Sequence, residues 1–196
     1  MNKRVVVATG NAGKVRELSA ALTPLALELV TQADLGVDPI PETASTFVEN
    51  ALAKARYAAS VSGLPAIADD SGLVVNALGG APGIRSARYA GEAATDADNN
   101  AKLLAALEGV EERTAYFTCC LVYLASEDDP APVIATARWY GLIVDSPRGD
   151  NGFGYDPHFL LPSLGRTAAE LPLAEKNRLS HRGQACRQLL GLLSRS

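Results

Sequence analysis

The sequence predicts an α/β fold in which a mixed β-sheet is flanked by helices. Apolar segments of helical and extended period alternate early in the chain, a long β-rich pair follows, and Gly and Pro separate the segments. Its 196 residues suffice to bury one core, so we expect a single domain over residues 1–196. Apolar residues make up 47% and charged residues 20%, which is typical of folded rather than disordered chains.

A strand, a glycine-rich turn and a helix are predicted first. Residues 5–8 form an apolar run that is typical of a buried strand. Apolar residues then recur at helical spacing over about residues 13–22, and Pro24 ends this helix. Residues 27–30 are predicted to form the second strand.

A capping box predicts the start of the second helix. Thr46 is the expected N-cap, and Glu49 follows three residues later. An alanine-rich stretch continues the helix to about Ser62, where Gly63 and Pro65 end it.

The next predicted strand covers residues 66–70 and ends in two carboxylates, and residues 74–77 form a short strand paired with it. The β-rich runs after the third helix are expected to form a hairpin. The remaining predicted elements are a helix over 95–107, the β-rich runs 114–125 and 133–144, a short strand over 159–161 and a helix over about 180–193.

Composition and charge exclude several classes of protein. The net charge of −4 gives no general attraction for polymeric nucleic acid. No run approaches the ~20 apolar residues of a membrane span, and the N-terminal residues lack the apolar core of a signal peptide. The three cysteines, two of them adjacent at Cys119 and Cys120, have no metal-ligand spacing. We therefore expect a cytoplasmic protein in a reducing compartment.

The turn after the first strand suits a phosphate. Backbone N–H groups and the positive end of a helix dipole converge at such a corner, and a lysine adds charge. It is not a Walker A loop, which would require glycine at Ala8 and Ser or Thr at Val15. A plain strand–turn–helix corner stays the alternative. The loop comprises Thr9, Gly10, Asn11, Ala12, Gly13 and Lys14.

Two adjacent acids, Asp69 and Asp70, follow the apolar run of the third strand. Open α/β sheets bind their ligands at strand ends. Successive side chains of a strand point to opposite sides, so we expect only one of the two acids to face the ligand. Carboxylate oxygens suit Mg²⁺, and one acid could take a proton from water. The alternative is a capped turn, because Asp-Ser-Gly at residues 70–72 is ordinary turn chemistry.

Further polar residues lie near the start of the second helix. Asn50 and Lys54 are four residues apart and share a face, whereas Glu49 lies off it and is explained by capping alone. Glu42 in the preceding loop is a further candidate. Lys54 on a solvated face is the alternative interpretation.

The C-terminal third holds two more candidate segments. In residues 152–157, two glycines allow close approach to a ligand and two aromatic residues could stack on a base; a packed irregular turn is the alternative. Lys176 and residues 180–183 gather basic donors near a helix start, which could instead be merely exposed. His158 is interpreted as structural.

Taken in order, these motifs resemble the inosine/xanthosine triphosphate pyrophosphatase family, over about residues 4–190. The match looks closest to the bacterial dITP/XTP pyrophosphatases. The motifs are the Thr9–Lys14 loop, Phe47–Ala51 with Lys54, Ala68–Leu73, Gly80–Gly83 with Ser86–Tyr89, Phe153–Pro157, Lys176 and Ser180–Gly183.

The resemblance implies an elongated mixed sheet, two lobes with a central substrate cleft, and a homodimer. It also implies Mg²⁺-dependent hydrolysis of ITP, dITP and XTP to the monophosphate and pyrophosphate. By this resemblance, Thr9 to Lys14 and Lys54 bind the triphosphate, and Ser71 contacts the substrate. Asp70 accepts a proton and ligates the metal, with Glu42 as a second metal contact. The nucleoside is bound by Phe153, Gly154, Tyr155 and Asp156, and the base is recognised by Lys176, His181 and Arg182.

Two other functions use the same residues. A non-catalytic nucleotide sensor could use the phosphate loop, although a pure binder gains little from carboxylates near phosphates. A phosphatase would release orthophosphate from smaller substrates.

Overall fold

The computed structural model describes residues 4–25 and 27–194. The first three of the N-terminal residues considered above for a signal peptide lie outside the described residues. The strands are β1 (Arg4–Ala8), β2 (Glu28–Thr31), β3 (Ala66–Val75), β4 (Thr114–Leu124), β5 (Val133–Ile143), β6 (Phe159–Leu161) and β7 (Arg166–Thr167). The α-helices are α1 (Ala12–Leu22), α2 (Phe47–Ser62), α3 (Asp96–Ala106), α4 (Leu173–Leu179) and α5 (His181–Leu193).

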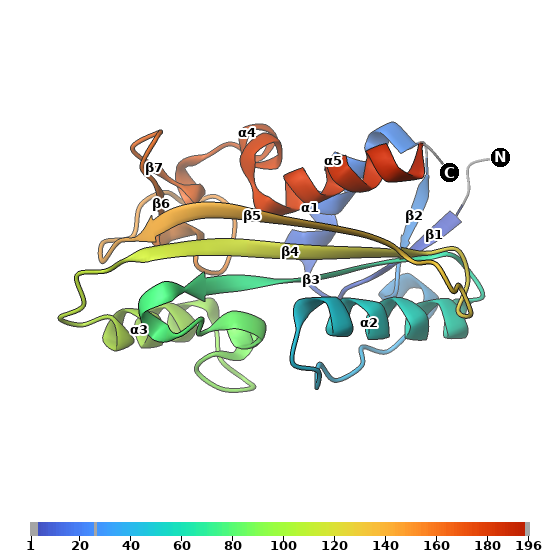
Figure 1. Ribbon diagram of the computed structural model, residues 1–196, viewed down its shortest axis with the longest axis horizontal. Helices are drawn as coiled ribbons and strands as arrows, with labels where there is room; N and C mark the ends of the chain where they lie inside the picture. Colours follow the sequence, from blue (N-terminus) through green and yellow to red (C-terminus); the bar gives the residue numbers. More distant parts are fainter. Residues whose placement is uncertain (1–3, 26, 195–196) are drawn as a thin grey trace. The chain divides into compact units, whose positions relative to one another are not determined.

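The strands form one seven-stranded sheet in the order β2-β1-β3-β4-β5-β6-β7 (Figure 1). Its β1 pairs in parallel with β2 and β3, whereas β6 pairs antiparallel with β5 and β7. The predicted mixed sheet with flanking helices is therefore confirmed. The elongated shape, the lobes, the cleft and the single domain stay predictions.

The chain divides into two compact units, and β3, β4 and β5 contribute residues to both. Unit 1 comprises Met1–Asp70, Cys119–Ala137 and His181–Ser196, and unit 2 comprises Ser71–Thr118 and Arg138–Ser180. In the described part of the chain, no helix has the length and apolar character to cross a membrane.

Unit 1 packs helices on both faces of its strands. Leu18 of α1 and Leu189 of α5 belong to one core cluster, and α1 and α5 lie side by side (Figure 1). The buried alanines of α2 belong to the other cluster, together with residues of β1, β3 and β4. Cys119 belongs to the first cluster and Cys120 to the second, as expected for adjacent residues of a strand.

Local signals fixed the ends of α2. The Thr46 side chain accepts a hydrogen bond from the Glu49 N–H, and Gly63 ends the helix with a left-handed φ of 65°. Ala51, Ala55 and Ala58 are buried, and such small side chains let the helix lie close to the sheet. The predicted cap and C-terminus are confirmed.

The prediction for residues 66–77 was wrong. We expected a strand ending at the two acids and a turn after them, but β3 continues without interruption to Val75. The parallel pairing with β1 does end here, with Ala8 opposite Ala68. β3 keeps β4 as its other neighbour, so backbone pairing with β4 can keep the chain extended beyond the acids. The acids therefore lie within a strand, just beyond the carboxyl end of β1.

Unit 2 has an aromatic core. Phe117 of β4 and Phe159 of β6 have ring centroids 4.5 Å apart, and Trp139 of β5 lies 5.5 Å from Phe159. Thr95 caps α3, which corresponds to the helix predicted over residues 95–107. Neither α4 nor the two-residue strand β7 was predicted from the sequence.

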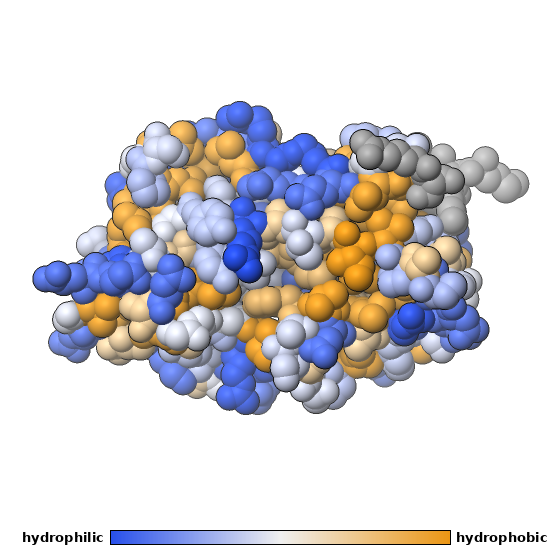
Figure 2. Space-filling view, viewed as in Figure 1, coloured by the Kyte–Doolittle hydropathy of each residue, from blue (hydrophilic) through white to orange (hydrophobic). Residues whose placement is uncertain are grey.

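Residues of β5 alternate between buried and exposed, and Ile134 and Tyr140 are exposed. Hydrophobic and hydrophilic side chains are intermingled on the face of the molecule seen in Figure 2. Isolated exposed apolar residues are normal on a folded surface, so exposure of these two alone identifies no site.

Candidate active site

The predicted phosphate loop connects β1 to α1 in unit 1. Asn11 is the N-cap of α1, and its Oδ1 accepts a hydrogen bond from the Lys14 N–H at 3.0 Å. Thr9 Oγ1 accepts from the Asn11 N–H at 3.3 Å, so two polar side chains fix the loop backbone. Gly10 is exposed and not left-handed, and the atom nearest to a Cβ there would be Gln32 Nε2 at 3.9 Å. The fold therefore does not require glycine here, and the absence of a side chain leaves room for close approach of a ligand.

The first turn of α1 is suited to an anion. It begins with Ala12 and Gly13 and contains no acidic residue, so no carboxylate of that turn offsets the positive end of the helix dipole. Lys14 Nζ lies 2.5 Å from Asp69 Oδ1, which keeps a second positive charge beside the loop.

Asp70 is held by two residues of α2, Asn50 and Lys54, and it shares the Lys54 ammonium with Glu42. Lys54 Nζ lies 2.9 Å from Asp70 Oδ1 and 2.7 Å from Glu42 Oε1. Asn50 Nδ2 donates to Asp70 Oδ2 at 3.3 Å. Asn50 and Lys54 are four residues apart on α2, so the predicted shared face is confirmed. Glu49, in contrast, is exposed and accepts from Thr46 Oγ1 at 2.6 Å, which supports its role in capping.

The environment of Asp70 gives it a raised proton affinity. Burial raises the pKa of Asp70 to about 6 against the opposing charges of Lys54 and Lys14, and Glu42 adds to the increase. Burial would lower the pKa of Lys54, but the carboxylates of Asp70 and Glu42 outweigh it, so the net shift is upward. Near neutral pH the site thus holds an ammonium beside a carboxylate that takes up protons more readily than an ordinary aspartate, which suits a general base.

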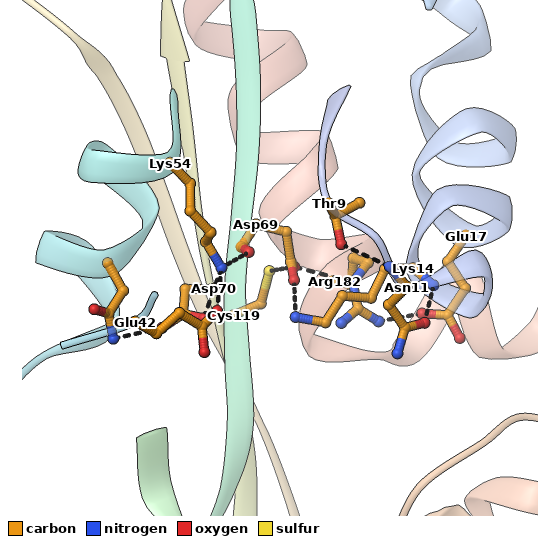
Figure 3. A network of polar contacts seen from close by, with 11 residues as sticks. Thr9, Asn11, Lys14, Glu17, Glu42, Lys54, Asp69, Asp70, Cys119 and Arg182 are labelled. Atoms are coloured by element: carbon orange, nitrogen blue, oxygen red, sulfur yellow. Dashed lines mark hydrogen bonds and ion pairs between the residues drawn. The ribbon is translucent and has the colours of Figure 1, made fainter. Parts of the chain in front are cut away.

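The neighbouring Asp69 has a different environment. In Figure 3 its side chain lies across β3 from Glu42 and Lys54, on the side of Lys14 and Arg182. Arg182 Nε donates to Asp69 Oδ2 at 3.0 Å, and Cys119 Sγ donates to the same oxygen at 3.1 Å. The expectation that the two acids face opposite sides of the strand is supported.

Asp69 is a buried anion stabilised by cations. Burial alone would raise its pKa, but Arg182 and Lys14 outweigh burial and hold the pKa of Asp69 well below its usual range. Arg182 also forms an ion pair with Glu17 of α1. Burial would lower the pKa of Arg182, but Asp69 and Glu17 outweigh it and raise that pKa. The predicted alternative of an exposed helix start is wrong, because Arg182 is only 2% exposed and belongs to this buried network.

Glu42 and Asp70 are the residues that could hold a divalent cation. Their carboxylate oxygens already converge on one positive charge, the Lys54 ammonium. Within residues 4–25 and 27–194 there is no group of three or more His, Cys, Asp or Glu side chains placed to hold a metal ion. Two carboxylates fit Mg²⁺, which commonly takes one or two protein carboxylates and completes its shell with water and substrate phosphates.

Unit 2 contains a second cluster of the predicted residues, around the segment of residues 152–156, here termed the Phe153 loop. Asp156 Oδ2 accepts from Lys176 Nζ at 2.5 Å and from the Phe153 N–H at 2.9 Å. Lys176 Nζ also lies 5.0 Å from the centroid of the Phe153 ring. A Cβ at Gly152 would collide with the Asp156 carboxylate, so this position requires glycine. The structure therefore joins Lys176 to Phe153 and Asp156, which the sequence analysis had placed in a different motif.

The remaining predicted residues occupy varied places. Tyr155 is buried and its hydroxyl donates to Ser86 O at 2.7 Å, so it serves the fold of the loop. Ser71 is half-buried on β3 immediately after Asp70, and His181 is buried at the first position of α5. His158 Nδ1 lies 2.9 Å from Val144 O, in accord with a structural role.

A match to a known family accompanies this geometry: residues 5–192 fit the model of the Ham1 family. The chain belongs to the Ham1 family. The structure of a HAM1 protein from Coxiella burnetii aligns with a TM-score of 0.91 at 49% identity, covering 99% of this chain and 100% of that one.

Curated relatives in the Ham1 family agree along nearly their whole length. A dITP/XTP pyrophosphatase from Shigella flexneri is 58% identical over 193 residues, which cover 97% of this chain and 98% of the relative. A dITP/XTP pyrophosphatase from Ralstonia nicotianae is 56% identical over 191 residues, covering 96% of this chain and 95% of the relative. The resemblance inferred from the motifs is therefore confirmed.

Sequence reasoning missed three members of the unit 1 network: Glu17, Asn50 as a donor to Asp70, and Cys119 as a donor to Asp69. One signal for Glu17 was available. It lies three residues after Lys14 and next to the buried Leu18, so it falls on the inward face of α1. A charged residue at such a position requires a buried partner of opposite sign.

Proposed function

We propose that this chain hydrolyses dITP, ITP and XTP to the nucleoside monophosphate and pyrophosphate. Its relatives in the Ham1 family carry the name dITP/XTP pyrophosphatase. The observation that carries the proposal is the geometry at Asp70, a buried carboxylate that lies 2.9 Å from the Lys54 ammonium, which it shares with Glu42. Burial raises the pKa of this carboxylate to about 6, which supports a role as general base. A site built only to bind phosphate would not need a carboxylate with raised proton affinity beside its cations.

The proposed reaction is in-line attack of water on the α-phosphorus. Asp70 accepts the proton of the attacking water while the new P–O bond forms, and the bond from the α-phosphorus to the bridging oxygen breaks to release pyrophosphate. Lys14, Lys54 and the N–H groups of the Thr9–Lys14 loop stabilise the charge on the β- and γ-phosphates. Glu42 and Asp70 would hold Mg²⁺, which as a Lewis acid stabilises negative charge on phosphate oxygens.

The proposed base selectivity belongs to the donors of Lys176, His181 and Arg182. Hypoxanthine and xanthine present a carbonyl acceptor at the purine 6-position, where adenine presents an amino donor. Donors aimed at this position would be left unpaired against adenine, which costs about 1–3 kcal/mol for each. Phe153 is the proposed stacking face, with Gly154 to Asp156 shaping its loop.

The product of ITP turnover tests the proposal. We expect incubation with ITP and Mg²⁺ to give IMP and pyrophosphate, identified by ³¹P NMR. Release of IDP and orthophosphate would replace the proposal with a phosphatase, and binding of ITP without turnover would replace it with a sensor.

We also propose that the protein acts in the cytoplasm as a homodimer. Light scattering coupled to size-exclusion chromatography tests this, and a monomeric mass at micromolar concentration would refute the dimer.

A further inference from the structure

Two side chains of α3 hold the backbone of Gly154 in the Phe153 loop. Asp96 Oδ2 accepts a hydrogen bond from the Gly154 N–H at 2.6 Å, and Asn100 Nδ2 donates to Gly154 O at 2.9 Å. Asp96 and Asn100 are four residues apart, so they lie on one face of α3. A single helix face thus engages both polar groups of one residue in the loop.

The orientation of Asn100 is determined by its partners. Its Nδ2 donates both to Gly154 O and to Asp96 O, each at 2.9 Å. Two carbonyl oxygens can only face the NH₂ end of the amide, because the other end is an acceptor. The Asn100 Oδ1 is buried and has no hydrogen-bond donor among the described residues. A buried unpaired acceptor costs stability, which offsets part of what the two hydrogen bonds of Nδ2 contribute.

The clamped residue lies next to Phe153. Gly154 has a left-handed φ of 63°, and it connects Phe153 to Tyr155, whose hydroxyl is fixed on Ser86 O. On the other side, the Phe153 N–H is fixed on Asp156. With both neighbours anchored, the peptide groups on either side of Gly154 set the direction of the Phe153 ring.

We propose that Asp96 and Asn100 are positioning residues for the purine side of the substrate. They act through the backbone of Gly154 and keep Phe153 in the orientation that stacks on the base. The inference rests on the proposed function, because that function assigns the base to Phe153.

Hydrogen exchange tests the clamp without reference to catalysis. In Asp96→Ala the Gly154 N–H loses its acceptor, and we expect it to exchange about tenfold faster or more. Asp98→Ala is the matched control, since Asp98 is also an acid of the first turn of α3 but accepts from Thr95 rather than from Gly154. Equal exchange of the Gly154 N–H in wild type and Asp96→Ala would overturn the clamp.

Kinetics test the positioning role. In Asp96→Ala and Asn100→Ala we expect KM for ITP to rise about fivefold with kcat changed less than about twofold, whereas inhibition by inorganic tripolyphosphate, which has no base, stays unchanged. Asp98→Ala should leave all three constants as in wild type. If the variants weaken the binding of ITP and of tripolyphosphate equally, the defect is a general structural one and the positioning role is overturned.

Wild-type protein that releases no pyrophosphate from ITP would overturn the proposed function itself, and with it the purine-side role. The hydrogen-exchange result would then still stand.

Discussion

The Nε of Arg182 lies 3.0 Å from Oδ2 of Asp69, and both side chains are buried. This ion pair separates the roles of two consecutive acids on β3. The positive charges of Arg182 and Lys14 lie beside Asp69 and keep its carboxylate ionised. Asp70, on the other side of the strand, has a pKa of about 6. We infer that Asp69 organises the site and that Asp70 performs the chemistry.

Replacing Asp70 should therefore remove turnover. Asp70→Asn keeps the shape of the side chain but cannot accept the proton from water, so kcat for ITP should fall by about 10²–10⁴-fold. Steady-state pyrophosphate release measures this. A kcat near that of wild type would rule out Asp70 as base.

The same variant should be more stable than wild type at neutral pH in the metal-free protein. The pKa of Asp70 is raised from 3.8 to about 6, so the folded state binds a proton more tightly than the unfolded state. The resulting stability is present below pH ~4 and lost as pH rises through ~6, by up to about 3 kcal/mol. Asn at this position carries no charge and avoids that loss. Urea unfolding in EDTA at pH 4 and pH 7.5 should show a gain for Asp70→Asn only at the higher pH; an equal difference at both would contradict the assignment.

Asp69→Asn should have the opposite effect. It removes one of the two carboxylates that pair with the buried Arg182, and breaking a buried ion pair typically costs about 3–5 kcal/mol. Urea unfolding at pH 7.5 should reveal this loss beside the Asp70→Asn variant. Unchanged stability would mean that Asp69 is not the organising residue.

Glu42→Gln should weaken the binding of Mg²⁺. It removes one of two carboxylates proposed to hold the metal, so the Mg²⁺ concentration for half-maximal ITP turnover should rise about tenfold or more. Glu49→Gln is the matched control, because Glu49 is a glutamate seven positions away that caps α2 and is exposed. A similar rise in both variants would exclude a specific role for Glu42.

The helices and strands of this fold were predictable where local chemistry decides them. Thr46 marked a helix start and Gly63 marked its end, and the β-rich run predicted over residues 133–144 corresponds to β5. The end of β3 was not predictable, since β4 remains beside it after β1 has ended, and strand neighbours are not encoded in local period. The seven-residue α4 was missed because it spans too few turns to give a periodic signal.

The candidate site divides in the same way. Asn50 and Lys54 could be assigned to one face because helical spacing is local. The pairing of Arg182 with Glu17 joins residues separated by 165 positions, and only the packing of α1 against α5 brings them together. Spacing could therefore nominate Asp69 and Asp70 together, but the cations that distinguish them come from distant parts of the chain.

Gly152 offers a test of the Phe153 loop that uses another glycine as its reference. Gly152 and Gly165 both have a left-handed φ, 78° and 64°, so the backbone strain of alanine should cost about 1–2 kcal/mol of stability at either position. Only at Gly152 would the new methyl collide with the Asp156 carboxylate and approach Lys176 Nζ at 3.2 Å, whereas nothing lies within 4 Å at Gly165. Displacing this ion pair disturbs the support of the Phe153 ring, so KM for ITP should rise about tenfold in Gly152→Ala, which is ~1.4 kcal/mol, and stay unchanged in Gly165→Ala. The test compares KM for ITP in the two variants, with the Tm of each measured alongside. Equal KM values would show that the Asp156–Lys176 pair does not act on the nucleoside.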